Sequence, residues 1–287
     1  MDNLQIFNLL TKENIKLKLN LYRSTSKRKN ITILYFHGGG LLYGIRDDLP
    51  KIYTDKFLDQ GYDILAFDYP LAPESNLNTI LEVCYEEILY FLNNYNSVFN
   101  LDSNDYILFG RSAGGYLVLI TCDRIIKNNI KKPLSIISLY GYSRLDEADF
   151  KTPSKYYKSF PKVTEDTIEN LISDKPIVYA PINSRFSLYI KARQDASWIN
   201  YLCSEEDINR FSVDTSSLKN FPPTILSAAT LDPDVPYKCS KFLSRNIPNS
   251  KLITVYKDVH DFDRDLSAAT GAKTYDEIIT WLENQYS

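Results

Sequence analysis

Short apolar segments alternate with amphipathic segments along most of this 287-residue chain. Ile31 to Phe36 and Ile64 to Phe67 are almost continuously apolar, β-branched and aromatic. Strands of this kind need a cover on both faces, and helices provide that cover in a parallel sheet. Leu77 to Tyr95 has helical spacing, and its apolar stripe is explained by packing on such a sheet rather than by a cofactor. The alternation predicts an α/β protein with a doubly wound, mostly parallel sheet flanked by helices.

The same reasoning predicts the remaining elements. A strand with strictly alternating apolar and polar residues is expected near a sheet edge, at Ile15 to Leu21. Other strands are expected at Tyr106 to Phe109, Leu134 to Leu139, Thr224 to Ala228 and Lys251 to Tyr256. Other helices are expected at Asp47 to Leu58, Ser112 to Lys127, Pro236 to Arg245 and Thr270 to Asn284.

The alternation breaks after Gly141. Residues 142–220 contain short helical pieces and no convincing buried strand. We therefore predict a core domain formed by residues 1–141 and 221–287, with residues 142–220 as an inserted, mainly helical cap. The aromatic residues of the insertion form either its own core or the wall of a pocket above the sheet. They are Tyr142, Tyr156, Tyr157, Phe160, Tyr179, Phe186, Tyr189, Trp198 and Tyr201.

The charge and hydropathy of the chain argue against two classes of partner, nucleic acids and membranes. A net charge of -3 and a pI near 5.6 supply no basic field, so we expect no nucleic-acid partner. No apolar run approaches the roughly 20 residues that a membrane-spanning helix needs, so no membrane insertion is expected. Met1-Asp2-Asn3-Leu4 lacks the basic region of a signal peptide, which favours a cytoplasmic location. The oligomeric state stays open between a monomer and a homodimer.

The four cysteines are widely scattered, without C-x-x-C spacing and without a neighbouring histidine. This pattern favours reduced thiols over a zinc site or a disulfide framework. The residues are Cys84, Cys122, Cys203 and Cys239. We expect no metal and no organic cofactor.

The segment Gly110-Arg111-Ser112-Ala113-Gly114 joins an expected strand to an expected helix. A serine hydroxyl is a poor nucleophile until a base takes its proton, and the flanking glycines allow a tight turn that exposes it. The chain has only two histidines from which to draw that base. His37 opens the run His37-Gly38-Gly39-Gly40, and His260 stands just past an apolar stretch. Ser112 is therefore the candidate nucleophile.

A third group should orient the base. With Ser112 as nucleophile and His260 as base, the acid falls between them in the order Ser, acid, His. The loop Leu231-Asp232-Pro233-Asp234, after the expected strand Thr224 to Ala228, offers two carboxylates there. Such an acid holds the imidazole in one tautomer and stabilises its charged form.

Taken together, these residues resemble a known family, the α/β-hydrolase esterases of the hormone-sensitive-lipase type, also described as the acetyl-esterase or arylacetamide-deacetylase group. The resemblance spans nearly the whole chain, with the motifs in the family's order. The motifs are His37-Gly38-Gly39-Gly40, Asp68-Tyr69-Pro70-Leu71-Ala72-Pro73-Glu74, Gly110-Arg111-Ser112-Ala113-Gly114-Gly115, Leu231-Asp232-Pro233 and His260-Asp261-Phe262. The resemblance implies an α/β-hydrolase fold with an inserted helical cap.

The resemblance also implies the roles of individual residues. Ser112 would be the nucleophile, His260 the base and Asp232 the acid, with Asp234 as the alternative acid. The oxyanion hole would be formed by the backbone N–H groups of three residues, Gly39, Gly40 and Ala113.

Other residues of the motifs would be structural. His37 would point away from the nucleophile. Asp68, Pro73 and Glu74 would anchor the loop beside the site through buried hydrogen bonds, so that replacing Asp68 harms folding more than chemistry.

Three positions depart from the family's pattern. Arg111 stands where the family usually has an acid, Pro70 where it usually has Arg, and Asp261 where it usually has Gly. These departures indicate either that Arg111 pairs with a nearby acid or that access to the site is altered.

The reading with the most support is a serine carboxylesterase that hydrolyses small to medium acyl esters through an acyl-enzyme at Ser112. Its partner would be a small-molecule ester. The same three residues would also serve an amide or formamide hydrolase or a sugar-ester deacetylase. A ligand-binding protein that kept the scaffold without turnover is the alternative outside catalysis.

Overall fold

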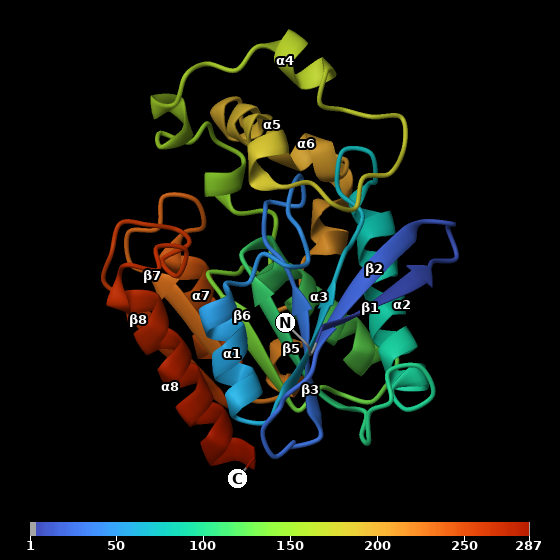
Figure 1. The fold of residues 1–287 in the computed structure, drawn as a ribbon. Coiled ribbons are helices and arrows are strands. Elements are labelled where there is room, and N and C mark those ends of the chain that lie inside the picture. Colours follow the sequence, from blue (N-terminus) through green and yellow to red (C-terminus); the bar gives the residue numbers. More distant parts are fainter. Residues whose placement is uncertain (1–3, 287) are drawn as a thin grey trace.

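One sheet runs through the computed structural model, which describes residues 4–286 (Figure 1). Its strand order is β1-β2-β4-β3-β5-β6-β7-β8. The antiparallel edge consists of β1 (Leu4–Leu10) and β2 (Lys16–Tyr22). The parallel strands are β3 (Ile31–Phe36), β4 (Asp63–Phe67), β5 (Asp105–Arg111), β6 (Ser135–Leu139), β7 (Thr224–Ala229) and β8 (Ser250–Val255). The predicted α/β-hydrolase architecture with a mostly parallel sheet is confirmed.

Helices cover both faces of the sheet (Figure 1). One hydrophobic cluster lies between the sheet and three helices, α2 (Leu77–Asn94), α3 (Ala113–Lys127) and α7 (Tyr237–Asn246). A second cluster lies on the other face, beneath α1 (Lys51–Asp59) and α8 (Ala269–Tyr286). Because every residue of β3, β4, β6 and β7 is buried, the continuously apolar sequences of these strands are explained by this two-sided cover.

Two elements differ from expectation. Strand β1 was missed, because the residues on its outer face, Leu4, Ile6 and Leu10, are exposed apolar side chains that obscure the alternation. The helix expected to begin at Asp47 begins at Lys51 instead. Pro50 is its N-cap, and the ring of a proline disfavours helical backbone in the residue before it.

The chain between β6 and β7 forms short helical pieces beyond the carboxyl ends of the central strands, at the top of Figure 1. Its α-helices are α4 (Glu165–Glu169), α5 (Ile182–Gln194) and α6 (Trp198–Leu202). Its 3-10 turns are η1 (Ala148–Phe150), η2 (Tyr157–Ser159), η3 (Glu205–Phe211) and η4 (Leu218–Asn220). The division into a core and a cap stays a prediction.

The four cysteines are free thiols. Among residues 4–286, no helix combines the length and the apolar character needed to cross a membrane. Met1 to Asn3, which belong to the segment used for the signal-peptide expectation, lie outside the described residues.

Candidate active site

Ser112 occupies a sharp turn between β5 and α3. Its backbone angles are φ 53° and ψ -117°, a conformation that residues other than glycine rarely adopt. The turn brings Gly114 so close to β3 that a Cβ there would overlap the carbonyl oxygen of Phe36. The Ser112 N–H donates to the carbonyl oxygen of Leu139, at 2.9 Å. This backbone geometry holds the Ser112 hydroxyl at the carboxyl edge of the sheet. It also explains why the motif has a glycine at position 114.

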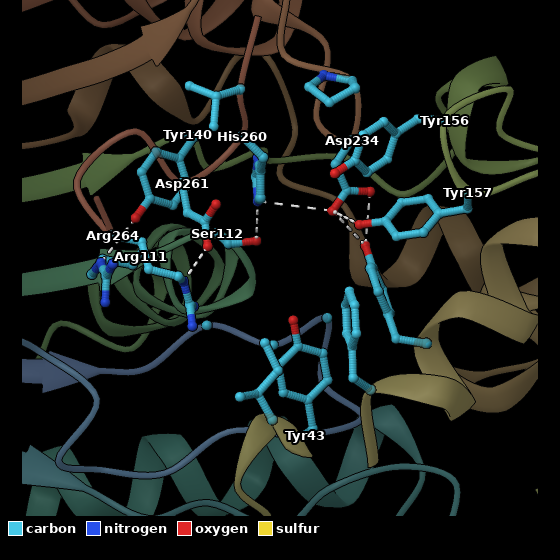
Figure 2. A pocket seen from close by; sticks show the side chains of 18 of the residues that line it. Tyr43, Arg111, Ser112, Tyr140, Tyr156, Tyr157, Asp234, His260, Asp261 and Arg264 are labelled. Atoms are coloured by element: carbon cyan, nitrogen blue, oxygen red, sulfur yellow. Dashed lines mark hydrogen bonds and ion pairs between the residues drawn. The ribbon is translucent and has the colours of Figure 1, made fainter. Parts of the chain in front are cut away.

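The imidazole of His260 lies between a hydroxyl and a carboxylate. Its Nε2 is 2.8 Å from Ser112 Oγ, and its Nδ1 is 2.7 Å from Asp232 Oδ2. The other oxygen of Asp232 accepts the N–H groups of Asp234 and Val235, at 2.8 and 2.9 Å. These residues follow β5, β7 and β8, whose carboxyl ends meet at one edge of the sheet. The structure thus brings together three of the residues that the sequence singled out. Figure 2 shows two of them, Ser112 and His260.

The alternative acid, Asp234, faces the other nitrogen of the ring. Its Oδ2 lies 3.9 Å from His260 Nε2, and its carboxylate accepts hydrogen bonds from the hydroxyls of Tyr157 and Tyr189. A carboxylate that fixes the tautomer of the base must meet Nδ1, because Nε2 has to receive the serine proton. The geometry therefore favours Asp232 as the orienting acid and leaves Asp234 without that role.

Acidic groups surround His260. Burial by itself lowers the pKa of the imidazole, but the carboxylates of Asp232, Asp234 and Asp261 outweigh it and raise the pKa to about 9. The charged imidazolium is therefore well stabilised at this site. That is the form the base takes after it accepts a proton from an attacking hydroxyl.

The residues predicted to form an oxyanion hole lie close to Ser112. Gly39 and Gly40 line the same pocket as Ser112, in the loop after β3. Both have positive φ, at 105° and 60°, and a Cβ on Gly40 would overlap the ring of Tyr189. Ala113 is the first residue of α3, where backbone N–H groups have no partner within the helix. The N–H groups of Gly39 and Gly40 thus lie in a loop and that of Ala113 at a helix N-terminus. Backbone N–H groups at such positions stabilise oxyanions in enzymes.

His37 is buried on the far side of the glycine run. Its Nδ1 lies 2.8 Å from the carbonyl oxygen of Gly38, and its ring stacks on Tyr69 at a centroid distance of 4.1 Å. Burial lowers the pKa of this imidazole. The side chain does not line the pocket around Ser112, in agreement with a structural role.

Arg111, the residue before the candidate nucleophile, is buried among acids. Its guanidinium is 3.0 Å from Asp263 and 3.3 Å from Asp48, and its Nε donates to the hydroxyl of Tyr140 at 2.8 Å. The hydroxyls of Tyr140 and Tyr275 both donate to Asp263. Of the two explanations offered for Arg111, the structure supports pairing with a nearby acid.

Asp263 was missed by sequence reasoning. A signal was present, since a buried arginine beside the nucleophile requires a carboxylate partner. The chain, however, offers several acids after His260, and nothing in their spacing selects Asp263.

The loop after β4 is held by buried ion pairs. Asp68 pairs with Arg46 at 2.8 Å and accepts the N–H of Lys18. Glu74 pairs with Arg185 of α5 at 3.0 Å. These carboxylates anchor backbone, and neither lines the pocket around Ser112.

The pocket above Ser112 has a volume of about 140 Å³. Its aromatic wall comes partly from the loop after β3 and partly from the inserted segment (Figure 2). The aromatic residues that line it are Tyr43, Tyr140, Tyr156, Tyr157, Phe186 and Tyr189. Tyr142 and Trp198 are instead buried against each other. The aromatic residues of the insertion thus divide between pocket wall and core, except Tyr179, which is 44% exposed and belongs to neither.

Among residues 4–286, no group of three or more His, Cys, Asp or Glu side chains is arranged to hold a metal ion.

The chain matches a known protein family. The family described as alpha/beta hydrolase fold matches residues 33–262, which is most of the chain. An arylesterase from Saccharolobus solfataricus is 26% identical over 52% of this chain and 47% of its own length. An esterase from Gibberella moniliformis is 24% identical over 70% of this chain and 56% of its own length. The chain thus spans about half the length of these curated relatives.

Two solved structures match nearly full length. A protein of unknown function from Staphylococcus aureus subsp. aureus Mu50 has a TM-score of 0.88 and 28% identity, covering 99% of this chain and 100% of that one. An alpha/beta hydrolase superfamily protein from Enterococcus faecalis has a TM-score of 0.85 and 29% identity, covering 98% and 99%.

Proposed function

This chain belongs to the alpha/beta hydrolase fold family, and on that premise we propose that it is a serine carboxylesterase acting on small acyl esters. One observation carries the proposal: the imidazole of His260 lies within hydrogen-bond distance of both Ser112 and Asp232. This is the geometry that lets a base take the proton of an attacking hydroxyl. The names of the two curated relatives, an arylesterase and an esterase, support an ester as substrate.

In the first half of the reaction, Ser112 Oγ attacks the carbonyl carbon of the ester while its proton moves to His260 Nε2. The carbonyl π electrons move onto oxygen, and the N–H groups of Gly39, Gly40 and Ala113 donate to the resulting oxyanion. Each such donor is worth roughly 3 kcal/mol of transition-state stabilisation. Collapse of the tetrahedral species breaks the bond to the alcohol, which leaves with the proton from Nε2.

In the second half, a water molecule takes the place of the alcohol. His260 Nε2 removes one proton from this water molecule while the water oxygen attacks the carbonyl carbon of the acyl-enzyme. The second tetrahedral species then expels Ser112 Oγ, which recovers a proton from Nε2. Asp232 remains ionised throughout and holds the imidazole with Nε2 toward the serine.

The size of the pocket bounds the substrate. A cavity of about 140 Å³ is close to the size that holds one benzene molecule in an engineered protein, at about 150 Å³. The aromatic side chains of the wall lower the local dielectric constant, which strengthens the electrostatic interactions at the reacting atoms. An acyl group from acetyl to butyryl fits this space. The cavity therefore favours the shorter acyl chains among the small to medium esters that the sequence predicts.

A short-chain nitrophenyl ester tests the proposal. The wild-type protein should hydrolyse nitrophenyl acetate, and Ser112→Ala should lose at least ~1,000-fold in kcat. A fluorophosphonate probe should label the wild-type protein at Ser112 and leave the Ala variant unlabelled. Hydrolysis that survives the substitution would overturn the role of Ser112. Failure of the folded wild-type protein to react with either reagent would favour the ligand-binding alternative.

A further inference from the structure

Tyr189 touches the loop that carries the candidate oxyanion donors. It lies on α5, within the inserted segment, and is 6% exposed. Its ring occupies the space that a side chain on Gly40 would need. Because Gly40 has no side chain, its backbone packs directly on this ring. This contact adds to the backbone hydrogen bonds that the carbonyl oxygen of Gly39 accepts from the N–H groups of Leu42 and Tyr43.

The hydroxyl of Tyr189 contacts a second loop of the site, the one that carries Asp232 and Asp234. It lies 3.0 and 2.9 Å from the two oxygens of Asp234, which is two residues beyond the candidate acid Asp232. Burial raises the pKa of the Tyr189 hydroxyl well above its ordinary value, so the group keeps its proton and donates. A single side chain thus spans two loops that are far apart in sequence.

Neighbouring residues reinforce both contacts. Trp198 Nε1 donates to the carbonyl oxygen of Gly40 at 2.8 Å. Arg193, one turn of α5 after Tyr189, donates from Nη2 to the backbone carbonyl of Asp234 at 3.2 Å and places Nε 3.2 Å from its carboxylate. The carboxylate of Asp234 is therefore already held by the inserted segment. This explains why it is not free to orient His260.

We propose that Tyr189 is a positioning residue, which holds the Gly38–Gly40 loop and the Asp232–Asp234 loop at a fixed separation by its ring on Gly40 and its hydroxyl on Asp234. The inference rests on the proposed esterase function. Oxyanion donors act only when they are in place before the charge develops, and a displacement of about 1 Å can lower the rate ~100-fold. The inserted segment therefore contributes to catalysis itself as well as to the pocket wall.

Tyr189→Phe tests this role, because it keeps the ring and removes only the hydroxyl. We expect kcat for nitrophenyl acetate to fall about 10-fold with KM within about twofold of wild type, since the loss affects the transition state rather than substrate binding. Labelling of Ser112 by a fluorophosphonate should slow in parallel, because that reaction also needs the oxyanion donors. Rates are compared at a pH where activity no longer changes with pH.

Two variants provide controls. Tyr157→Phe removes an equivalent hydroxyl from the same Asp234 carboxylate, but the ring of Tyr157 is not the one that meets Gly40. We expect it to lower kcat clearly less than Tyr189→Phe. Tyr201→Phe removes a hydroxyl elsewhere in the inserted segment, outside the pocket, and should match wild type. Equal losses in Tyr157→Phe and Tyr189→Phe would overturn the bridge to Gly40.

The remaining outcomes are also decisive. Unchanged kcat in Tyr189→Phe, with or without a lower melting temperature, would leave Tyr189 a purely structural residue and the esterase proposal intact. If Tyr189→Phe does not fold, Asp234→Asn weakens the same bond from the other side, and unchanged kcat in that variant would overturn the proposal. A wild-type protein that neither hydrolyses esters nor labels at Ser112 would overturn the proposed function and, with it, this role.

Discussion

At the scale of single residues, the choice between two neighbouring acids shows what determines a catalytic role. Asp232 and Asp234 are close in sequence and chemically identical, yet they face different nitrogens of His260. Asp232 is held by two backbone N–H groups of its own turn, whereas Asp234 is held by tyrosines of the inserted segment. The roles that we propose for the two acids follow from these partners rather than from the residue type.

The raised pKa of His260 predicts a pH dependence. The imidazole must be neutral to accept the serine proton, and its pKa lies near 9 rather than the ordinary 6.5. We therefore expect kcat/KM to rise as the pH increases and to level off above about pH 9. The same shift stabilises the folded protein below about pH 6.5, and that contribution is lost as the pH rises through about 9.

Asp234→Asn tests the cause of this shift. Removing a negative charge 3.9 Å from Nε2 should lower the pKa of His260 and move the acid limb of the profile down by about 1 pH unit. Profiles of kcat/KM between about pH 6 and about pH 10 measure it for both proteins. A limb that stays in place would show that Asp232 and Asp261 alone hold the proton on His260.

At the scale of elements, the buried ion pair of Arg111 and Asp263 joins two of the loops that form the site. Arg111 ends β5 beside the candidate nucleophile, and Asp263 lies three residues after the candidate base. The hydroxyls of Tyr140 and Tyr275 also donate to the Asp263 carboxylate, one to each oxygen. The pair therefore fixes the loop after β8 against the turn after β5.

Removing one partner of this pair should be strongly destabilising. Arg111→Met leaves the Asp263 carboxylate buried without its cation, and we expect the free energy of unfolding to fall by about 3–5 kcal/mol. The double variant Arg111→Met with Asp263→Asn should recover part of that loss, because the buried charge is gone as well. Urea unfolding of both variants measures the difference. A double variant less stable than Arg111→Met would argue against an unpaired charge as the cause.

At the scale of the whole molecule, the pocket is assembled from distant parts of the chain. The sheet supplies the turns that carry Ser112, Asp232 and His260, and the inserted segment supplies Tyr157, Phe186 and Tyr189. We therefore propose that the insertion limits which substrates reach the serine. Changes in the insertion should alter substrate choice while leaving the sheet intact.

A series of nitrophenyl esters tests this limit. Because the cavity measures about 140 Å³, kcat/KM should be highest for acetate or butyrate and should fall at least 10-fold for octanoate. Phe186→Ala removes part of the wall and should raise the rate for octanoate relative to acetate. A wild-type protein that hydrolyses octanoate as fast as acetate would show that the cavity does not limit the acyl chain.

Much of this protein could be derived from its sequence because the signals are local. Continuous apolar runs between amphipathic segments determined the order of strands and helices, since burial on one or two faces leaves a pattern in neighbouring residues. The glycines around Ser112 and the small number of histidines identified two of the candidate catalytic residues. Strand β1 was missed because it lacks this local signal: its outward residues are apolar where exposure to water would favour polar ones.

Other features were decided only by the tertiary structure. The choice of Asp232 over Asp234 beside His260 Nδ1, the pairing of Arg111 with Asp263, and the contacts of Tyr189 with Gly40 and Asp234 all join segments far apart in the chain. No local pattern encodes such contacts, because the distance between these side chains is set by the sheet and by the way the inserted segment packs over it. Composition and periodicity determine which elements form, whereas the separations on which catalysis depends exist only after those elements pack together.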